Sequence, residues 1–240
     1  MLQIKNTYKN KKFSILGDSI STLEGYSEPK TAVHYNRSYQ PISGVRSISD
    51  TWWGQVIEQL EGKLLVNNSW SGSTVSRHPL YEIPSYGCSD ERTSALGKDG
   101  EAPDVILVFM GINDWGMGMR SASNPLIKGS ENDLSIFSVA YRVMLEKLKS
   151  NYPQAEIWCM TLPISRCTRE ENYQFNYYSR GRHLAEYCEG IEKSGKECGC
   201  YVIDLYRFEE RYDTVDGAHP TVSGMTTLAR AVLKAMQEEK

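Results

Sequence analysis

Ser19 lies in the segment GDSIS (17–21), directly after a short apolar run, and its hydroxyl is a candidate nucleophile. A serine hydroxyl is inert at its ordinary pKa, and it attacks a carbonyl carbon only when an adjacent base removes its proton. The segment is also compatible with a plain polar turn in which Ser19 caps a helix. The chemistry therefore depends on whether the chain supplies a base.

The segment DGAHP (216–220) offers such a base, because a histidine follows an aspartate by three residues. At this spacing, in a turn that enters a helix, the Cβ atoms of Asp216 and His219 can lie roughly 5–6 Å apart. The carboxylate can then hold one imidazole nitrogen while the other nitrogen faces Ser19, as in the triad of serine hydrolases. Asp216 and His219 could equally cap the C-terminal helix, since Pro220 and an anion both suit a helix N-terminus.

The elements that must position these side chains are predicted from the apolar pattern. Apolar runs rich in β-branched residues predict five strands, at residues 13–16, 64–67, 105–110, 156–161 and 201–205. Helical spacing of apolar residues predicts helices at 51–60, 134–148 and 222–236, and a less regular helix at about 172–193. Strands that alternate with helices indicate a parallel sheet with crossover helices. The sequence thus predicts a single domain (1–240) of the three-layer α/β/α, flavodoxin-like class with a five-stranded parallel sheet. The stretches 24–50 and 77–103 show no clear period, and such long loops are usually functional.

Four chemically distinctive residues follow these predicted strands. Ser19 follows the first strand, Gly72 the second and Asn113 the third, while His219 lies after the fifth. In open α/β sheets the ligand crevice lies beyond the carboxyl ends of the strands. The four residues are therefore expected to converge at one edge of the sheet, and this convergence is a stronger argument than any single segment.

Four segments in this order resemble the SGNH (GDSL-type) hydrolases, a family of serine esterases, lipases and acylhydrolases. They are GDSIS (17–21), NNSWSG (67–72), GIND (111–114) and DGAHP (216–220). The resemblance extends from about residue 13 to residue 236. It departs from the family at Ser69, where a glycine is common, so the loop path around Trp70 can differ. The segments NDWG (113–116), YP (152–153) and MTLP (160–163) look like one bacterial branch, some of whose members cleave acyl groups from carbohydrates.

The resemblance implies a role for each segment. Ser19, His219 and Asp216 would form the catalytic triad, and the oxyanion hole would consist of the backbone N–H groups of Ser19 and Gly72 with the side-chain amide of Asn113. Such donors stabilise the negative charge of a tetrahedral intermediate, and removing one costs about 3–4 kcal/mol. A glycine at position 72 also lets the backbone approach a substrate closely. Taken alone, Gly72 could be an ordinary loop glycine and Asn113 a turn residue.

Aromatic residues crowd the expected rim of this site. Trp70 and Trp115 flank the proposed donors, and Tyr26, Tyr35 and Tyr39 lie in the long first loop. Flat amphipathic rings suit sugar faces or acyl chains, although these rings could equally pack under the loops. Trp70 and Trp115 are therefore candidate substrate-binding residues. The expected substrate is a small, for instance acetyl, ester on a carbohydrate or other polar carrier, which the enzyme cleaves through an acyl-enzyme without a cofactor.

The remaining polar residues show no further catalytic pattern. Asp18 and Asp114 are interpreted as hydrogen-bonding scaffolds for their loops. The other histidines lack a carboxylate at triad spacing and are interpreted as surface or loop residues; they are His34, His78 and His183. The six cysteines are interpreted as free thiols, because a chain of this length does not need disulfides. Cys198 and Cys200 form the only tight pair and lack a second pair or histidine cluster, so no metal site is expected.

Composition excludes several classes of function. The 240 residues carry a net charge of −3 with dispersed Lys and Arg, which does not suggest binding to nucleic acid. The longest strongly apolar run, 105–110, is far too short to span a membrane. Residues 1–12 are polar and rich in lysine and precede no apolar signal region, so the expected location is cytoplasmic.

A non-enzymatic function is the alternative. The Ser/Thr-rich segment 18–22 could cradle a phosphate, as in flavodoxin-like nucleotide binders. A catalytically silent module could also bind glycans through the same surface. Neither alternative explains why Asp216 and His219 stand at triad spacing.

Overall fold

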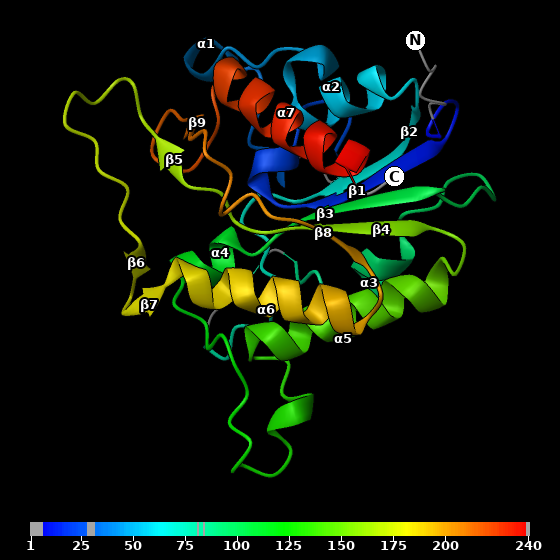
Figure 1. The fold of residues 1–240 in the computed structure, drawn as a ribbon, viewed down its shortest axis with the longest axis vertical. Helices are drawn as coiled ribbons and strands as arrows, with labels where there is room; N and C mark the ends of the chain where they lie inside the picture. The colour runs from blue at the N-terminus through cyan, green and yellow to red at the C-terminus, as the bar shows by residue number, and fades with distance from the viewer. Residues whose placement is uncertain (1–6, 28–31, 81, 84, 239–240) are drawn as a thin grey trace.

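The protein is built around a five-stranded parallel sheet, seen in a computed structural model that describes residues 7–27, 32–80, 82–83 and 85–238. Its strand order is β2-β1-β3-β4-β8 (Figure 1). The strands are β1 (Lys12–Gly17), β2 (Lys63–Ser69), β3 (Val105–Phe109), β4 (Glu156–Met160) and β8 (Tyr201–Ile203). Each predicted strand coincides with an observed one, and all four pairings are parallel. The predicted α/β fold is confirmed.

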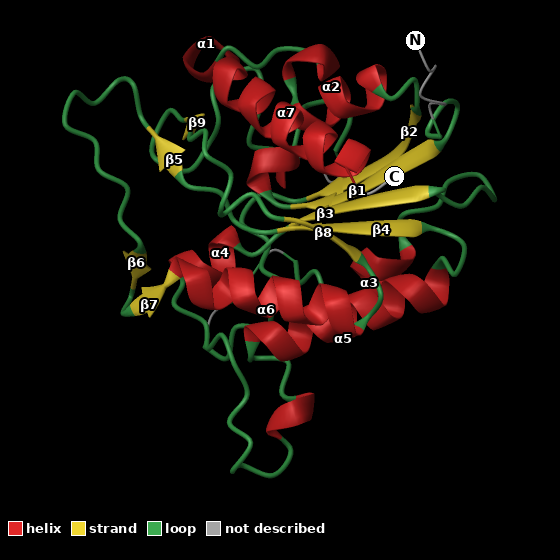
Figure 2. Cartoon of the chain, viewed as in Figure 1, coloured by secondary structure: helices red, strands yellow, loops and turns green. Residues whose placement is uncertain are grey.

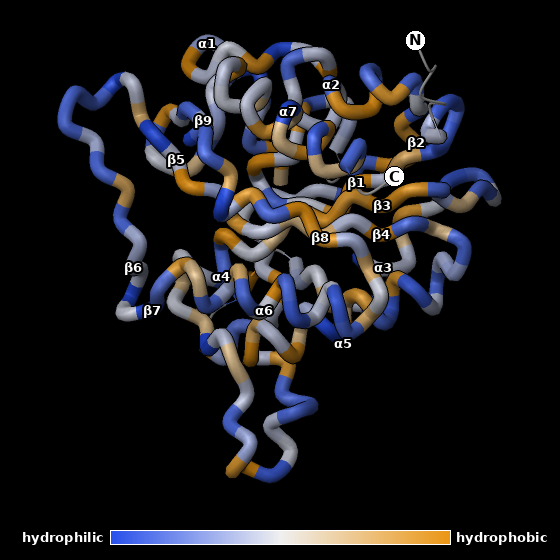
Figure 3. Tube along the Cα trace, viewed as in Figure 1, coloured by the Kyte–Doolittle hydropathy of each residue, from blue (hydrophilic) through white to orange (hydrophobic). Residues whose placement is uncertain are grey.

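Helices cover both faces of the sheet (Figure 2). One face carries α2 (Trp52–Gln59) and α7 (Val222–Glu238); the other carries α3 (Asp90–Ser94), α5 (Phe137–Asn151) and α6 (Leu184–Glu197). Every residue of β3 is buried, as expected for a central parallel strand packed on two sides. Figure 3 shows hydrophobic residues along these central strands and mostly hydrophilic residues in the outer loops. The sheet therefore divides two apolar cores, one under each helical layer.

The predicted helix at 172–193 is correct only in its second half. The chain first forms a small antiparallel hairpin, β6 (Tyr178–Ser179) and β7 (Arg182–His183), and α6 begins at Leu184. Arg180 and Gly181, at the hairpin turn, both have positive φ angles, of 46° and 78°. A right-handed helix cannot include such residues. His183 caps α6, since its Nδ1 accepts a hydrogen bond from the backbone N–H of Ala185.

The two long aperiodic stretches contain short elements that lack a readable period. Residues 24–50 hold α1 (Gln40–Ser43) and the 3-10 turn η3 (Ile48–Asp50), and residues 77–103 hold α3. Residues 28–31, 81 and 84 of these stretches lie outside the described part. Other short elements are η1 (Ser19–Ser21), α4 (Ile112–Gly116), η4 (Ser130–Asn132) and the parallel pair β5 (Ser165–Arg166) and β9 (Tyr212–Asp213).

Two expectations from composition can be compared with the structure. All six cysteines are free thiols, as predicted. Within the described residues, no helix has the length and apolar character needed to cross a membrane.

Candidate active site

Ser19 lies at the carboxyl end of β1, in the tight turn η1. The side chain of Asp18 caps this turn by accepting the backbone N–H of Ile20 at 3.1 Å. Gly17 permits the close packing behind the turn, because a Cβ at this position would lie only 2.7 Å from Ser21 Cβ and Ser69 Oγ. Ser19 is 5% exposed, so little of it is in contact with bulk water.

His219 contacts Ser19 across about two hundred residues of chain. The Nε2 atom of His219 lies 3.0 Å from Ser19 Oγ, and its Nδ1 atom lies 2.8 Å from Asp216 Oδ2. The other oxygen of Asp216 accepts the backbone N–H groups of His219 at 2.8 Å and Ala218 at 3.0 Å. The structure therefore joins the hydroxyl, imidazole and carboxylate predicted from the sequence in one hydrogen-bonded series.

The protonation state of Asp216 fixes the direction of these hydrogen bonds. Partial burial alone would raise the pKa of this carboxyl, but hydrogen bonds from the His219 ring and backbone hold it well below its ordinary value. An ionised carboxylate only accepts hydrogen bonds, so Nδ1 of His219 carries the hydrogen. Its Nε2 is then free to accept the proton of Ser19.

The loop after β2 lies beside Ser19. The backbone N–H of Trp70 donates to the carbonyl of Gly17 at 3.2 Å, and the side-chain amide of Asn113 donates to the carbonyl of Ser73 at 2.8 Å. Gly72 has a φ of 74°, a conformation that favours glycine. Within the described chain, no hydrogen bond engages the backbone N–H of Ser19 or Gly72. The side-chain amide of Asn113 donates only this one hydrogen bond among the residues that the structure describes, so its second N–H hydrogen has no acceptor there.

Comparisons with known proteins identify the family of this chain. A family model described as GDSL-like lipase/acylhydrolase matches residues 11–173. The chain belongs to this family. Membership indicates an esterase or acylhydrolase. No curated protein gives a significant match.

Solved structures of similar proteins align with nearly the whole length of this chain. A protein described as a GDSL-like lipase from Bacteroides ovatus is 26% identical, with a TM-score of 0.72 over 96% of this chain and 99% of that one. A second, from Bacteroides uniformis, is 28% identical, with a TM-score of 0.70 over 95% and 96% of the two chains. A family two carbohydrate esterase from Clostridium thermocellum, solved with cellohexaose, is 16% identical with a TM-score of 0.57. The alignment covers 97% of this chain and 65% of the esterase, and it shows the fold alone.

Arg92 is a residue of this GDSL-like hydrolase that the sequence analysis missed. It is fully buried on α3, and its guanidinium donates to the carbonyls of Gly17 at 2.9 Å and Asn68 at 2.8 Å. It also donates to the hydroxyls of Ser73 at 2.7 Å and Ser85 at 2.8 Å. Burial lowers the pKa of Arg92 to about 9, so it remains a cation at neutral pH. Its neighbours in sequence give no sign of this role.

Two buried aspartates support the loops, as predicted. Asp114 accepts the backbone N–H groups of Val75 at 2.8 Å and Ser76 at 3.0 Å, and also the Ser76 hydroxyl. Burial raises the pKa of Asp114 to about 6, against the opposing effect of these hydrogen bonds. Burial likewise raises the pKa of Asp18 to about 7, although the hydrogen bond from Ile20 opposes it.

His34 lies in a loop, as predicted, but its ring also contacts His219, which the sequence did not indicate. The half-buried ring of His34 stacks on His219, with 3.6 Å between centroids and 12° between ring planes. Tyr35, expected at the rim, is fully buried, and its hydroxyl donates to the carbonyl of Pro220 at 2.9 Å. Tyr39 meets both imidazole rings edge to face. Only the fold brings this loop to the turn that carries His219, so the local sequence around His34 could not reveal the contact.

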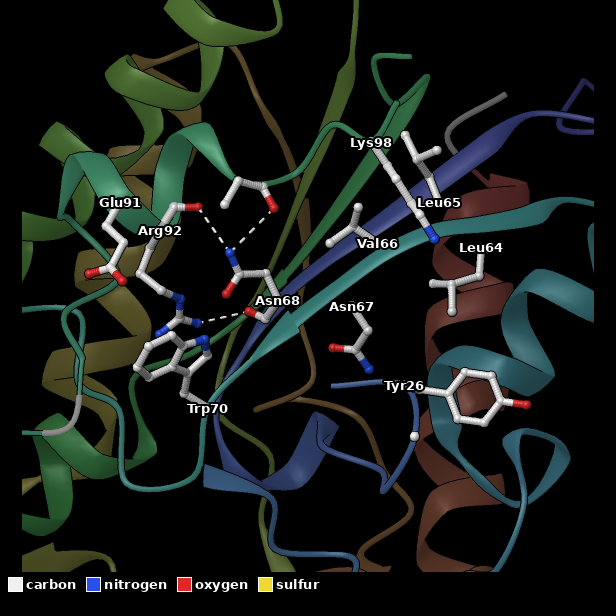
Figure 4. Close-up of a pocket in the computed structure, with 12 residues that line it drawn as sticks. Tyr26, Leu64, Leu65, Val66, Asn67, Asn68, Trp70, Glu91, Arg92 and Lys98 are labelled. Atoms are coloured by element: carbon white, nitrogen blue, oxygen red, sulfur yellow. Dashed lines mark hydrogen bonds between the residues drawn. The ribbon is translucent and has the colours of Figure 1, made fainter. Parts of the chain in front are cut away.

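The two tryptophans of the candidate substrate site have different surroundings. Trp115 donates its indole N–H to the carbonyl of Arg182 at 3.1 Å and stacks on Phe175, so it also anchors the chain before α6. Trp70 lies over the guanidinium of Arg92, 5.4 Å from the ring centroid (Figure 4). It lines a cavity of about 840 Å³ along the outer edge of β2, here called the β2-edge cavity. This cavity is lined by Gly25, Tyr26, 64–68, Trp70, Glu91, Arg92, Ala95 and Lys98.

Proposed function

We propose that this protein hydrolyses carboxylic esters through an acyl-enzyme formed on Ser19. His219 acts as the general base in this proposal, and Asp216 holds and stabilises its ring. The observation that carries the proposal is the hydrogen-bonded series from Ser19 through His219 to Asp216, with contacts of 3.0 and 2.8 Å. A serine is activated by a base in this geometry, whatever fold presents it.

The reaction proceeds in two halves. In the first, Ser19 Oγ attacks the ester carbonyl carbon while His219 Nε2 takes the hydroxyl proton. The tetrahedral intermediate then collapses, the C–O bond to the alcohol breaks, and the imidazolium donates its proton to the departing alcohol oxygen. In the second half, His219 takes a proton from water as the water oxygen attacks the acyl carbon. Collapse releases the carboxylic acid and returns the proton to Ser19.

The negative charge of each tetrahedral intermediate requires donors close to Ser19. We propose the backbone N–H groups of Ser19 and Gly72 and the side-chain amide of Asn113 for this role. In support, both backbone groups lack an acceptor among the described residues, and Asn113 is oriented by its bond to Ser73. Donors fixed in advance need no reorganisation during the reaction, which is the main source of their effect.

The substrate class is a small acyl ester, such as an acetyl group, on a carbohydrate or another polar carrier. We assign the carrier to the β2-edge cavity, of about 840 Å³, whose described lining includes Trp70 but not Ser19 or His219. Trp70 belongs both to its lining and to the loop that holds Gly72. A structurally similar carbohydrate esterase was solved with cellohexaose, and its shared fold makes a carbohydrate a reasonable first carrier to test.

Turnover of 4-nitrophenyl acetate tests the reaction. We expect the wild-type protein to release 4-nitrophenol and Ser19→Ala to reduce kcat by roughly 10³- to 10⁶-fold, close to the uncatalysed rate. A fluorophosphonate probe should label Ser19 in the wild type and leave Ser19→Ala unlabelled. Asp90→Ala, which changes an exposed carboxylate on α3, is the control. Equal turnover by wild type and Ser19→Ala would refute the proposal.

A further inference from the structure

Three aromatic side chains of the long first loop pack against His219 or the residue after it. They form an aromatic clamp, defined here as His34, Tyr35 and Tyr39. His34 lies flat on the His219 ring at 3.6 Å, and Tyr39 meets it edge to face at 6.2 Å. Tyr35 holds Pro220, the residue after His219, because its hydroxyl donates a hydrogen bond to the Pro220 carbonyl. The clamp therefore contacts both the ring of His219 and the backbone that carries it.

The clamp is also connected to the turn of the nucleophile. The backbone N–H of His34 donates to the hydroxyl of Thr22 at 3.0 Å, and this hydroxyl donates to the carbonyl of Ser19 at 2.8 Å. The distance between the His219 ring and Ser19 is thus controlled from both sides by one loop. Thr22 is fully buried, so water does not compete for these two bonds.

His34 remains neutral in this position. Burial and, to a smaller extent, the neighbouring His219 lower the pKa of His34 to about 4, against the opposing effect of Asp216. Its Nε2 atom is buried and has no hydrogen-bond partner among the described residues. The ring of His34 thus acts through its flat face and not through a hydrogen bond.

We propose that His34 is a positioning residue for the base of this reaction. It holds the plane of the His219 ring so that Nε2 points at Ser19, and it presents an uncharged ring to the imidazolium that forms on proton transfer. A neutral flat ring restricts rotation about the side-chain bonds of His219 without competing for its proton. The proposal rests on the proposed function of Ser19 and His219, and it assigns a role to the loop at residues 32–39.

Substitutions that keep or remove the flat ring test the positioning role. We expect His34→Ala to lower kcat for 4-nitrophenyl acetate by roughly 10- to 100-fold with KM changed less than about twofold, since small displacements of a catalytic group have effects of this size. His34→Phe should restore kcat to within about threefold of wild type, because it keeps a flat ring and breaks no hydrogen bond. Arg37→Ala, in the same loop with a side chain that is 89% exposed, is the matched control. Equal losses in His34→Ala and His34→Phe would overturn the proposal.

A charged substitution tests the contact itself. The titratable groups that surround His219 are Asp216 on its own turn, Asp18 before Ser19, and the clamp residues His34, Tyr35 and Tyr39. His34→Arg adds a permanent positive charge beside the ring, which disfavours the imidazolium and lowers the pKa of His219. The acid limb of kcat/KM, where His219 loses its proton, should move to lower pH by roughly 0.5–1 unit. An unmoved limb would contradict the stacked geometry.

A readout independent of turnover separates this proposal from the proposed function. The pKa of His219 can be followed by NMR through its imidazole carbon-bound protons in wild type, His34→Arg and Arg37→Ala. If the protein cleaves no ester but the His219 pKa is lower in His34→Arg, the stacking of His34 on His219 is supported and the proposed hydrolysis is refuted. If the protein cleaves esters but the His219 pKa is unchanged in His34→Arg, the proposed hydrolysis is supported and the positioning role of His34 is refuted. If His34→Ala does not fold, His34→Phe and His34→Arg still decide the question.

Discussion

The surroundings of two carboxyl groups at the site shift their pKa values in opposite directions. Asp216 accepts several hydrogen bonds in a half-exposed turn, which keeps its pKa low and its carboxylate ionised. Asp18 lies one residue from the nucleophile but is buried, and burial raises its pKa to about 7. The two carboxyl groups are therefore suited to different tasks: the first stabilises an imidazolium, and the second caps a turn and ionises only as the pH rises through about 7.

The raised pKa of Asp18 predicts a pH-dependent cost in stability. Between pH 3.8, the ordinary pKa of this carboxyl, and about pH 7, Asp18 holds a proton in the folded protein that it has lost in the unfolded chain. This contribution to the free energy of unfolding is complete below pH 3.8 and is lost as the pH rises through about 7. Asn at this position still accepts the N–H of Ile20 but does not titrate. We therefore expect Asp18→Asn to gain stability relative to wild type as the pH rises from 4 to 8.

Urea unfolding at pH 4, 6 and 8 measures this difference. Asp114, whose pKa burial also raises, is present in both proteins, so its own burial contributes equally to both. Asp133→Asn is a useful control of the opposite sign, because hydrogen bonds from Ser135 lower the pKa of that partly exposed carboxyl. A difference between wild type and Asp18→Asn that stays constant across the three pH values would disprove the expectation.

At the scale of elements, the short helix α3 connects the segments that form the site. Arg92 donates four hydrogen bonds from this helix, to the end of β1, the end of β2 and the loop that follows β2. A planar guanidinium can supply this fork of donors, whereas an ammonium group cannot. The face of Trp70 also lies over it. Arg92 therefore orders the loop beside Ser19 and one wall of the β2-edge cavity.

We expect Arg92→Met to lower the free energy of unfolding by about 3–5 kcal/mol, because it leaves buried carbonyl and hydroxyl groups unpaired. Arg92→Lys should be less destabilising and should still reduce kcat, since it cannot hold Gly17 and Ser73 together. Urea unfolding and 4-nitrophenyl acetate turnover measure the two effects. Arg230→Met removes an exposed ion pair with Glu210 and should change stability by less than about 1 kcal/mol. Comparable losses in Arg92→Met and Arg230→Met would show that the buried network is unimportant.

Elements were predictable wherever burial dominates the local sequence. β3 is an apolar run buried on both faces, and the prediction located it to within one residue. The helix at 172–193 was predicted too long, because Tyr and Asn at 172–178 resemble a weak helical period while the turn at Arg180 and Gly181 decides the structure. Short helices such as α3 span too few turns to show a period at all.

At the scale of the whole molecule, the strand order of the sheet brings the residues of the candidate site together. Because β1 lies between β2 and β3, the segments that follow these three strands are neighbours at the carboxyl edge. Ser19, Gly72 and Asn113 could therefore be predicted from their places after strands. His34 and Arg92 could not, since their partners are about 185 and 75 residues away in the chain and no local pattern marks either contact.

Trp70 lies in the loop after β2, beside Ser19, and also lines the β2-edge cavity, so occupancy of that cavity should depend on the size of the substrate. Leu65 lines it from the edge strand and is only partly buried. We expect Leu65→Arg to lower kcat/KM at least about tenfold more for acetylated cello-oligosaccharides than for 4-nitrophenyl acetate, because only the larger carrier needs the filled space. Ile127→Arg, at an exposed apolar residue of another loop, is the control. Equal changes for both substrates would place the carrier elsewhere, while selective loss on the oligosaccharide would assign the cavity to the alcohol side of the ester.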